Sequence, residues 1–191
     1  MKLGLIISSL LYFVILMLIQ NQGCNGCLEK ERIGLLEIKH YILSQDEGYS
    51  YHSTEEYSYN IKELGSWVDD RDSNCCSWKR VKCSNTSSGH ITELSLYLLL
   101  FETPDSKMLN VSLFRPFEEL RLLDLSYNSF QGWIGNEGFQ GIKMVETLDL
   151  SRNHLNSSIL SSLNNGLTAL TTLNLGNNKI DNNFFAQAMQ L

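Results

Sequence analysis

The chain has 191 residues, with 15 basic against 21 acidic side chains and a formal net charge of −6 at pH 7. No basic patch or stripe is present to neutralise phosphates, so the composition argues against nucleic acid as a partner. Only two prolines are present, which excludes a proline-rich linker.

Residues 1–23 have the layout of a secretory signal peptide. Lys2 carries the only side-chain charge ahead of an apolar run from Leu3 to Ile19, and small and polar residues follow this run. Cleavage after Gly23 or after Gly26 fits the pattern, and a retained N-terminal anchor is the alternative. In each case we expect the rest of the chain to enter the oxidising secretory pathway.

The five cysteines have a direct meaning in a secreted chain, where even sets pair into disulfides. Cys24 lies in the cleavage region, and its removal would leave four. Joining the neighbours Cys75 and Cys76 would need a strained ring, which disfavours one of the three pairings. Of the two that remain, we favour Cys27 with Cys75 and Cys76 with Cys83.

A helix is predicted from Glu29 to about Ser44. Its apolar residues fall on one broad stripe at helical spacing, with Ile33 and Tyr41 off the stripe. The members of the stripe are Leu28, Leu35, Leu36, Ile38, Ile42 and Leu43. The following residues, Gln45 to Glu63, are polar and rich in tyrosine and serine, and we interpret them as a loop insertion.

Three Asn-x-Ser/Thr sequons fit secretion and predict surface glycosylation at Asn85, Asn110 and Asn156. Sequons arise by chance in chains rich in asparagine and serine. Together with a signal peptide and paired cysteines, however, they form a coherent set.

The second half of the chain is a repeat. Three segments, 120–130, 145–155 and 170–180, obey the pattern L-x-x-L-x-L-x-x-N-x-L. Their asparagines, Asn128, Asn153 and Asn178, are spaced by 25 residues, inside the leucine-rich-repeat range of about 20–29. A degenerate copy begins at Ile91 and has Leu99 at the asparagine position.

The pattern predicts an α/β solenoid, a leucine-rich repeat with short parallel strands on its concave face. We expect the three asparagines to be a framework, because a buried amide satisfies backbone groups of its own and the neighbouring coil. The segment Phe130–Ile134 fits L-x-G-x-I, typical of the plant-specific repeat, and glycines at 132, 135, 138 and 141 suggest an irregular convex segment. The predicted domains are a cap over 24–90 and about four repeats over 91–191, incomplete at the C-terminal end.

The predicted ligand face consists of the residues that alternate with the inward leucines of each strand. The candidates are Tyr97, Leu122, Asp124, Ser126, Thr147, Asp149, Ser151, Thr172 and Asn174, with Glu93, Ser95 and Gly176 completing the stripe. Four strands at about 4.8 Å span only about 14–19 Å. This is small for a specific protein interface, so we expect weak binding by these strands alone.

From about Cys27 to its end, the chain resembles plant leucine-rich-repeat receptor-like proteins. The motifs that carry the resemblance are Ser66-Trp67, Cys75-Cys76-x-Trp78-x-x-Val81-x-Cys83 and Gly89-x-Ile91-x-x-Leu94-x-Leu96, followed by the three repeats. Arg80 departs from the glycine usual before the valine, from which we expect an altered turn in an intact, disulfide-linked helical cap.

The resemblance implies a protein at the plasma membrane with its repeats outside, which binds a protein, peptide or glycan ligand and recruits a co-receptor kinase in defence or development. Membrane attachment would come from a C-terminal helix outside this sequence or from the retained N-terminal anchor. We interpret the chain as an N-terminal fragment or truncated product of such a receptor. Two other functions are considered: a secreted inhibitor of cell-wall-degrading enzymes, and a truncated product without binding activity.

Catalytic, cofactor and metal sites are not predicted. Zinc held by Cys76, Cys83 and His90 is the rival to the disulfides, and an oxidising compartment disfavours it. The remaining histidines stand in no catalytic motif. Glu55 and Glu56 lie in a polar segment with no sign of a cleft between two carboxylates.

Overall fold

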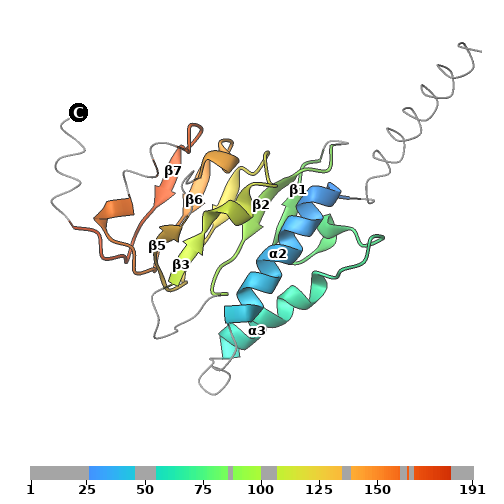
Figure 1. The fold of residues 1–191 in the computed structure, drawn as a ribbon, viewed down its shortest axis with the longest axis horizontal. Helices are drawn as coiled ribbons and strands as arrows, with labels where there is room; N and C mark the ends of the chain where they lie inside the picture. Colours follow the sequence, from blue (N-terminus) through green and yellow to red (C-terminus); the bar gives the residue numbers. More distant parts are fainter. Residues whose placement is uncertain are drawn as a thin grey trace, which may run out of the picture.

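The computed structural model describes residues 26–45, 55–85, 88–99, 107–134, 139–159, 163 and 166–181. The predicted signal peptide and Cys24 lie outside these residues. Helices α2 (Glu29–Gln45) and α3 (Glu55–Glu63) lie at one end of a row of strands that runs from β1 to β7 (Figure 1). The fold is the predicted leucine-rich-repeat solenoid behind a helical, disulfide-linked cap.

Helix α2 buries one face against the first coils. Leu35, Ile38 and Ile42 are each at most 1% exposed, as their helical spacing predicted. The ends of the stripe differ from the prediction: Leu43 is 40% exposed, whereas Tyr41 packs against the core and donates its hydroxyl to the Met108 carbonyl at 3.2 Å. The helix therefore faces the repeats along a slightly rotated stripe.

The predicted loop insertion over 45–63 is wrong in its second half, where the chain forms α3. The helix leads directly into a 3₁₀ turn, Leu64–Ser66. Ile61 and Leu64, three residues apart, pack against the core, and Leu64 is fully buried. Only these two apolar residues stand among polar neighbours, so the helical periodicity was too weak to predict this helix from the sequence.

Two disulfides and two tryptophans close the cap. Cys27 pairs with Cys75, and Cys76 pairs with Cys83, as favoured from the sequence. Trp67 and Trp78 stack with their ring centroids 6.1 Å apart. Each indole N–H finds an acceptor at 2.8 Å, so the large apolar rings are buried without leaving a polar atom unpaired. The acceptors are the Lys79 carbonyl for Trp67 and the Ser73 hydroxyl for Trp78.

Buried charges, which no sequence pattern predicts, also join α2 to its surroundings. The carboxylate of Glu31 is fully buried, accepts from the Ile91 N–H at 3.0 Å and lies 3.1 Å from His90 Nδ1. Burial raises the pKa of Glu31, although these two contacts oppose the rise. Arg32, 3% exposed, pairs with Glu29 and with Asp69, which raises its pKa further above the usual value.

The main sheet has five strands in the order β1-β2-β4-β6-β7. Strand β1 (Val81–Cys83) runs antiparallel to β2 (Ile91–Ser95), so the cap and the first repeat share one sheet. Strands β4 (Leu122–Asp124), β6 (Thr147–Asp149) and β7 (Thr172–Asn174) then add in parallel, one per repeat.

The strand leucines form a continuous interior row. Leu94, Leu123 and Leu148 are aligned in register and have no measurable exposure. The next members, Leu96, Leu125 and Leu150, are at most 5% exposed. In β7, the last described strand of this sheet, Leu173 is 37% exposed.

The three repeat asparagines link successive coils, as their predicted framework role requires. Asn153 is 3% exposed; its amide donates to the carbonyls of Leu125 and Leu150 at 3.0 Å, and its oxygen accepts from the Phe130 N–H at 3.1 Å. Asn178 makes the equivalent bonds one coil later. Asn128 makes the equivalent donations one coil earlier, but its oxygen accepts from the Leu99 N–H, at the asparagine position of the degenerate first copy. Backbone groups that turn inward are thereby satisfied without water.

A second sheet was not predicted. Strands β3 (Lys107–Asn110) and β5 (Phe130–Ile134) pair in parallel, and an isolated bridge between Asn156 and Lys179 continues the same arrangement in the later coils. Gly132 lies inside β5 and not in an irregular segment, and the end of the Met108 side chain packs over it. Residues 135 and 138 lie outside the described residues.

Asn153→Ala should lower the free energy of unfolding by about 3 kcal/mol, because it leaves the buried Phe130 N–H without an acceptor and removes one of the two amide donors at each of the Leu125 and Leu150 carbonyls. Asn178→Ala is the matched control. It removes the same set of bonds at a half-buried position, where water replaces them, and should cost about 1 kcal/mol. Urea unfolding followed by circular dichroism measures both. Equal losses in the two variants would contradict the framework interpretation.

Candidate functional site

The strand residues predicted to face outward form two straight rows across the coils. The first row aligns Glu93, Leu122, Thr147 and Thr172, and the second aligns Ser95, Asp124, Asp149 and Asn174. All are at least partly exposed. The structure thus brings these predicted residues together on one face.

Side chains of the second row form hydrogen bonds with one another and with the turns that follow the strands. Ser95 donates to Asp124 at 3.0 Å, and Asn174 donates to Asp149 at 2.9 Å. The other oxygen of Asp124 accepts from the Ser126 N–H, two residues on, which is the geometry of an Asx turn. These carboxylates therefore stabilise the coil, and each keeps only part of its bonding capacity for a ligand.

Two of the predicted ligand-face residues are not on the surface. Ser126 and Ser151 are 6% and 9% exposed, so their placement on the outward stripe is corrected. Their backbone N–H groups are held by Asp124 and Asp149, and this turn draws the serine inward. Strict alternation with period two ends where the strand ends, which is why extending it by two residues failed.

The residue after each of these serines is exposed instead. Tyr127 has a φ of 56° and is 37% exposed, and Arg152 has a φ of 53° and is exposed. Leu98 and Asn177 occupy the same repeat position and are also left-handed. Every described coil therefore turns at a fixed offset, two residues after the last strand leucine.

Three side chains at these turns form a continuous surface, which we name the tyrosine–arginine ledge: Tyr97, Tyr127 and Arg152. The rings of Tyr97 and Tyr127 meet edge to face with centroids 5.0 Å apart. The Arg152 guanidinium lies 4.6 Å from the centroid of the Tyr127 ring. Only Tyr97 was predicted as a site residue; the fixed repeat offset was the signal that could have identified the other two.

Helix α3 borders the ledge. The hydroxyl of Tyr97 donates to Glu56 at 2.9 Å, and the Tyr97 carbonyl accepts from Arg80 at 2.8 Å. Arg80 also bonds Asn60 and Glu63 of α3. The segment interpreted as a loop is therefore a wall at the cap end of the predicted ligand face.

Arg80, which stands where glycine was expected, fixes helix α3 in this place. Its φ of 70° is the left-handed conformation that glycine adopts at less cost. Its side chain is 8% exposed, and the guanidinium bonds Asn60 and Glu63 of α3 and the Tyr97 carbonyl just after β2, which offsets the strain. At this left-handed turn the Arg80 side chain thus links α3 to the residues that follow β2.

The remaining site predictions have these positions. Asn85 and Asn156 are exposed, and Asn110 is half-buried. The Asn110 and Asn156 oxygens each accept from the serine two residues on. In the described ranges, no group of three or more His, Cys, Asp and Glu residues could hold a metal ion. Nor does any helix within those ranges have the length and apolarity to cross a bilayer.

Comparisons with known proteins agree with this architecture. Residues 57–84 match the family "Leucine rich repeat N-terminal domain", and residues 144–165 match "Leucine Rich Repeat". The chain is a leucine-rich-repeat protein. Neither matching family is an enzyme family.

Its sequence relatives are plant receptor-like proteins. It is 42% identical over 137 residues to Receptor-like protein 14 of Arabidopsis thaliana, covering 70% of this chain and 13% of that protein. It is 40% identical over 144 residues to Receptor like protein 21 of the same plant, covering 72% of this chain and 13% of the relative. The chain therefore spans about an eighth of the length of these proteins.

Among solved structures, the chain is similar to one in the crystal structure of the BIR3–SERK2 complex from Arabidopsis thaliana. The TM-score is 0.50 at 28% sequence identity, over 61% of this chain and 60% of that chain.

Tyr97 should ionise at a higher pH than free tyrosine. Burial and then the hydrogen bond to Glu56 raise the pKa of Tyr97, so the folded state favours the neutral phenol. This contribution to stability is present below the unfolded pKa of about 10 and is lost as the pH rises through the folded value. NMR titration of labelled tyrosine, assigned with Tyr97→Phe, measures it. Glu56→Gln should bring the value partly back; an unaltered titration in this variant would contradict the contact.

Proposed function

We propose that this chain is the N-terminal part of an extracellular binding module of a plant cell-surface receptor-like protein. The proposal includes a signal peptide over residues 1–23, a cap over 24–90, repeats over 91–191 and a role in defence or development. In this function the strands offer a ligand face to a protein, peptide or glycan, and the assembly engages the ectodomain of a receptor kinase. The relatives' identity as receptor-like proteins supports this role.

The observation that carries the proposal is the tyrosine–arginine ledge. Aromatic residues and arginine are the side chains that contribute most to protein interfaces. Here they are exposed in an unbroken row, next to the polar rows of the sheet and bounded by Glu56 of α3. A coil needs neither Tyr127 nor Arg152 for its own core, because both side chains lie outside it.

The size of this surface limits its affinity. Because neighbouring coils are only about 4.8 Å apart, the surface of three coils is smaller than the area of about 800 Å² that each partner buries in a stable interface. The ledge therefore contributes part of an interface whose remainder lies on further repeats or on the bound ligand. Weak binding, in the micromolar range or above, is the expectation for this chain alone.

Binding to a purified receptor-kinase ectodomain tests the proposal, with the SERK2 ectodomain as the first probe. A full receptor ectodomain that begins with this sequence is immobilised and titrated with the probe. The double variant Tyr127→Ala/Arg152→Ala should weaken binding about tenfold, since each truncated contact is worth about 0.5–1 kcal/mol.

The matched control for this experiment is Gln131→Ala/Ile134→Ala, which changes two exposed residues of β5 in the other sheet. It should leave the affinity unchanged. If the control variant weakens binding and the ledge variant does not, the second sheet is the binding face and the proposal is wrong. Absence of binding by the unaltered ectodomain to any kinase of this class would also contradict it.

Secretion can be tested through the sequons. Expressed in plant cells, the chain should leave the cell and carry N-glycans, and Asn85→Gln, Asn110→Gln and Asn156→Gln should each remove the mass of one glycan. Asn177→Gln, an exposed asparagine outside any sequon, is the control and should change nothing. An unglycosylated chain with free thiols in the cytosol would rule out the extracellular assignment.

A further inference from the structure

The two disulfides of the cap lie in opposite surroundings, although Cys75 and Cys76 are adjacent in the chain. Cys27 and Cys75 are 1% and 0% exposed and lie in the main hydrophobic core. Cys76 and Cys83 are half-buried and line an open cavity of about 580 Å³. A reagent in solvent can therefore approach one bridge and not the other.

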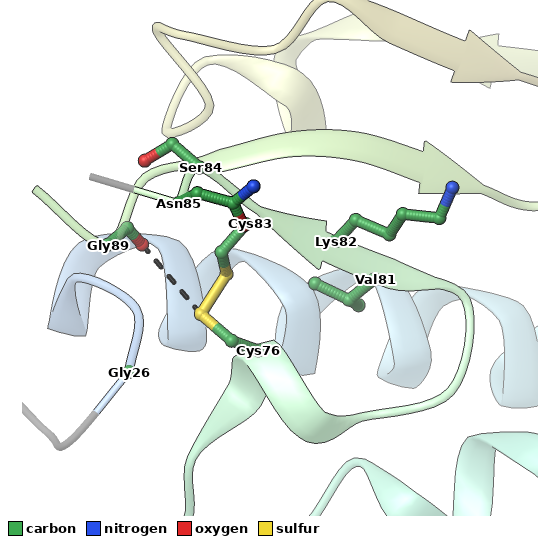
Figure 2. Close-up of a pocket in the computed structure, with 8 residues that line it drawn as sticks. All are labelled: Gly26, Cys76, Val81, Lys82, Cys83, Ser84, Asn85 and Gly89. Carbon is green, nitrogen blue, oxygen red and sulfur yellow. Dashed lines mark hydrogen bonds between the residues drawn. A yellow bond between two sulfur atoms is a disulfide. The ribbon is translucent and has the colours of Figure 1, made fainter. Parts of the chain in front are cut away.

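The cavity has room beside the sulfur atoms (Figure 2). Gly26 and Gly89 form part of its wall, and neither has a side chain to cover the bridge. Gly89 cannot be replaced by a larger residue, because a Cβ there would lie 2.0 Å from the Gly26 carbonyl oxygen. The access is thus a property of the backbone at this corner of the cap.

The bridge also closes a small loop that other contacts hold in place. Cys76 and Cys83 are seven residues apart, whereas Cys27 and Cys75 are 48 apart. The antiparallel pairing of β1 with β2 holds Cys83, and the buried bridge at Cys75 together with the hydrogen bond that the Cys76 N–H donates to the Asn74 side-chain oxygen holds Cys76. Opening the outer bridge would leave all these contacts intact.

We propose that Cys76–Cys83 is a thiol–disulfide exchange site that a dithiol reductant opens while the rest of the cap stays folded. A thiolate of the reductant attacks one sulfur and forms a mixed disulfide, and the Cys76–Cys83 bond breaks with its electron pair on the departing sulfur, which takes a proton from water. The second thiol of the reductant then attacks the mixed disulfide. This attack breaks the mixed disulfide, releases the second protein cysteine as a thiolate that takes a proton, and closes the reductant into a cyclic disulfide. Over the two steps two electrons pass to the protein and both cysteines become thiols.

The opened form has a place for the new thiol. Cys76 Sγ lies 3.9 Å from the Gly89 carbonyl oxygen, within the reach of an S–H donor. The reduced pair therefore remains beside the same cavity, where it can attack a disulfide compound; two exchange steps re-form the Cys76–Cys83 bond and release that compound as two thiols.

The test is differential alkylation of the secreted chain carrying Cys24→Ser, after enzymatic removal of N-glycans from positions such as Asn85 at the cavity. Dithiothreitol is added under native conditions, samples are quenched and alkylated at intervals, and the four cysteines are quantified by peptide mass spectrometry. Cys76 and Cys83 should be labelled about tenfold faster than Cys27 and Cys75 or more, because access governs the exchange rate. In guanidinium chloride the difference should disappear.

Simultaneous labelling of all four cysteines under native conditions would overturn the proposal, because it would mean that the cap unfolds before either bridge opens. Earlier labelling of Cys27 and Cys75 would overturn it as well. The double variant Cys76→Ser/Cys83→Ser provides a second measurement. Its Cys27–Cys75 bridge should stay closed at the same reductant concentration, and opening of that bridge would show that the two are not independent.

Discussion

The structure depends on a buried asparagine amide that bonds backbone groups of two successive coils. A solenoid turns its chain at the end of every strand, and each turn directs carbonyl and N–H groups into an apolar interior, where an unpaired polar group is costly. Asn128, Asn153 and Asn178 satisfy those groups at a constant interval. The leucine row supplies the apolar burial, but the amides fix how far one coil lies from the next and so align the rows of the sheet.

The cap covers the first coil in the same way that each repeat covers the next one. Strand β1 covers the edge of β2, which would otherwise present unpaired backbone groups. The Glu31 carboxylate of α2 accepts from the N–H of Ile91, at the start of β2. It thus provides the acceptor that a preceding coil would otherwise provide. A terminal unit of different sequence is needed because the first repeat has no preceding coil against which to pack.

How much could be predicted from the sequence depended on whether the relevant signal is periodic. The repeat spacing, the asparagine framework and the strand registers follow from residues that recur every 25 positions, and the α/β solenoid was confirmed. Helix α3 and the second sheet were missed, because they are stabilised by contacts that do not recur along the sequence. Examples are the ion pair of Arg80 with Glu63 and the packing of Met108 against Gly132. At the candidate site, Ser126 and Ser151 were misplaced because the strand alternation was continued into a turn, and Tyr127 and Arg152 were missed for the same reason.

The left-handed residue in each coil has a consequence for how such a surface can vary. At Leu98, Tyr127, Arg152 and Asn177 the backbone imposes an unfavourable conformation whose cost is about 1–2 kcal/mol for an ordinary side chain. That cost depends little on which ordinary side chain is present, so the exposed tyrosine and arginine are interchangeable as far as the coil is concerned. Leu98 is only 4% exposed, but at Tyr127, Arg152 and Asn177 the side chain faces solvent, so mutation there can change what the protein displays to its surroundings while the framework beneath stays the same.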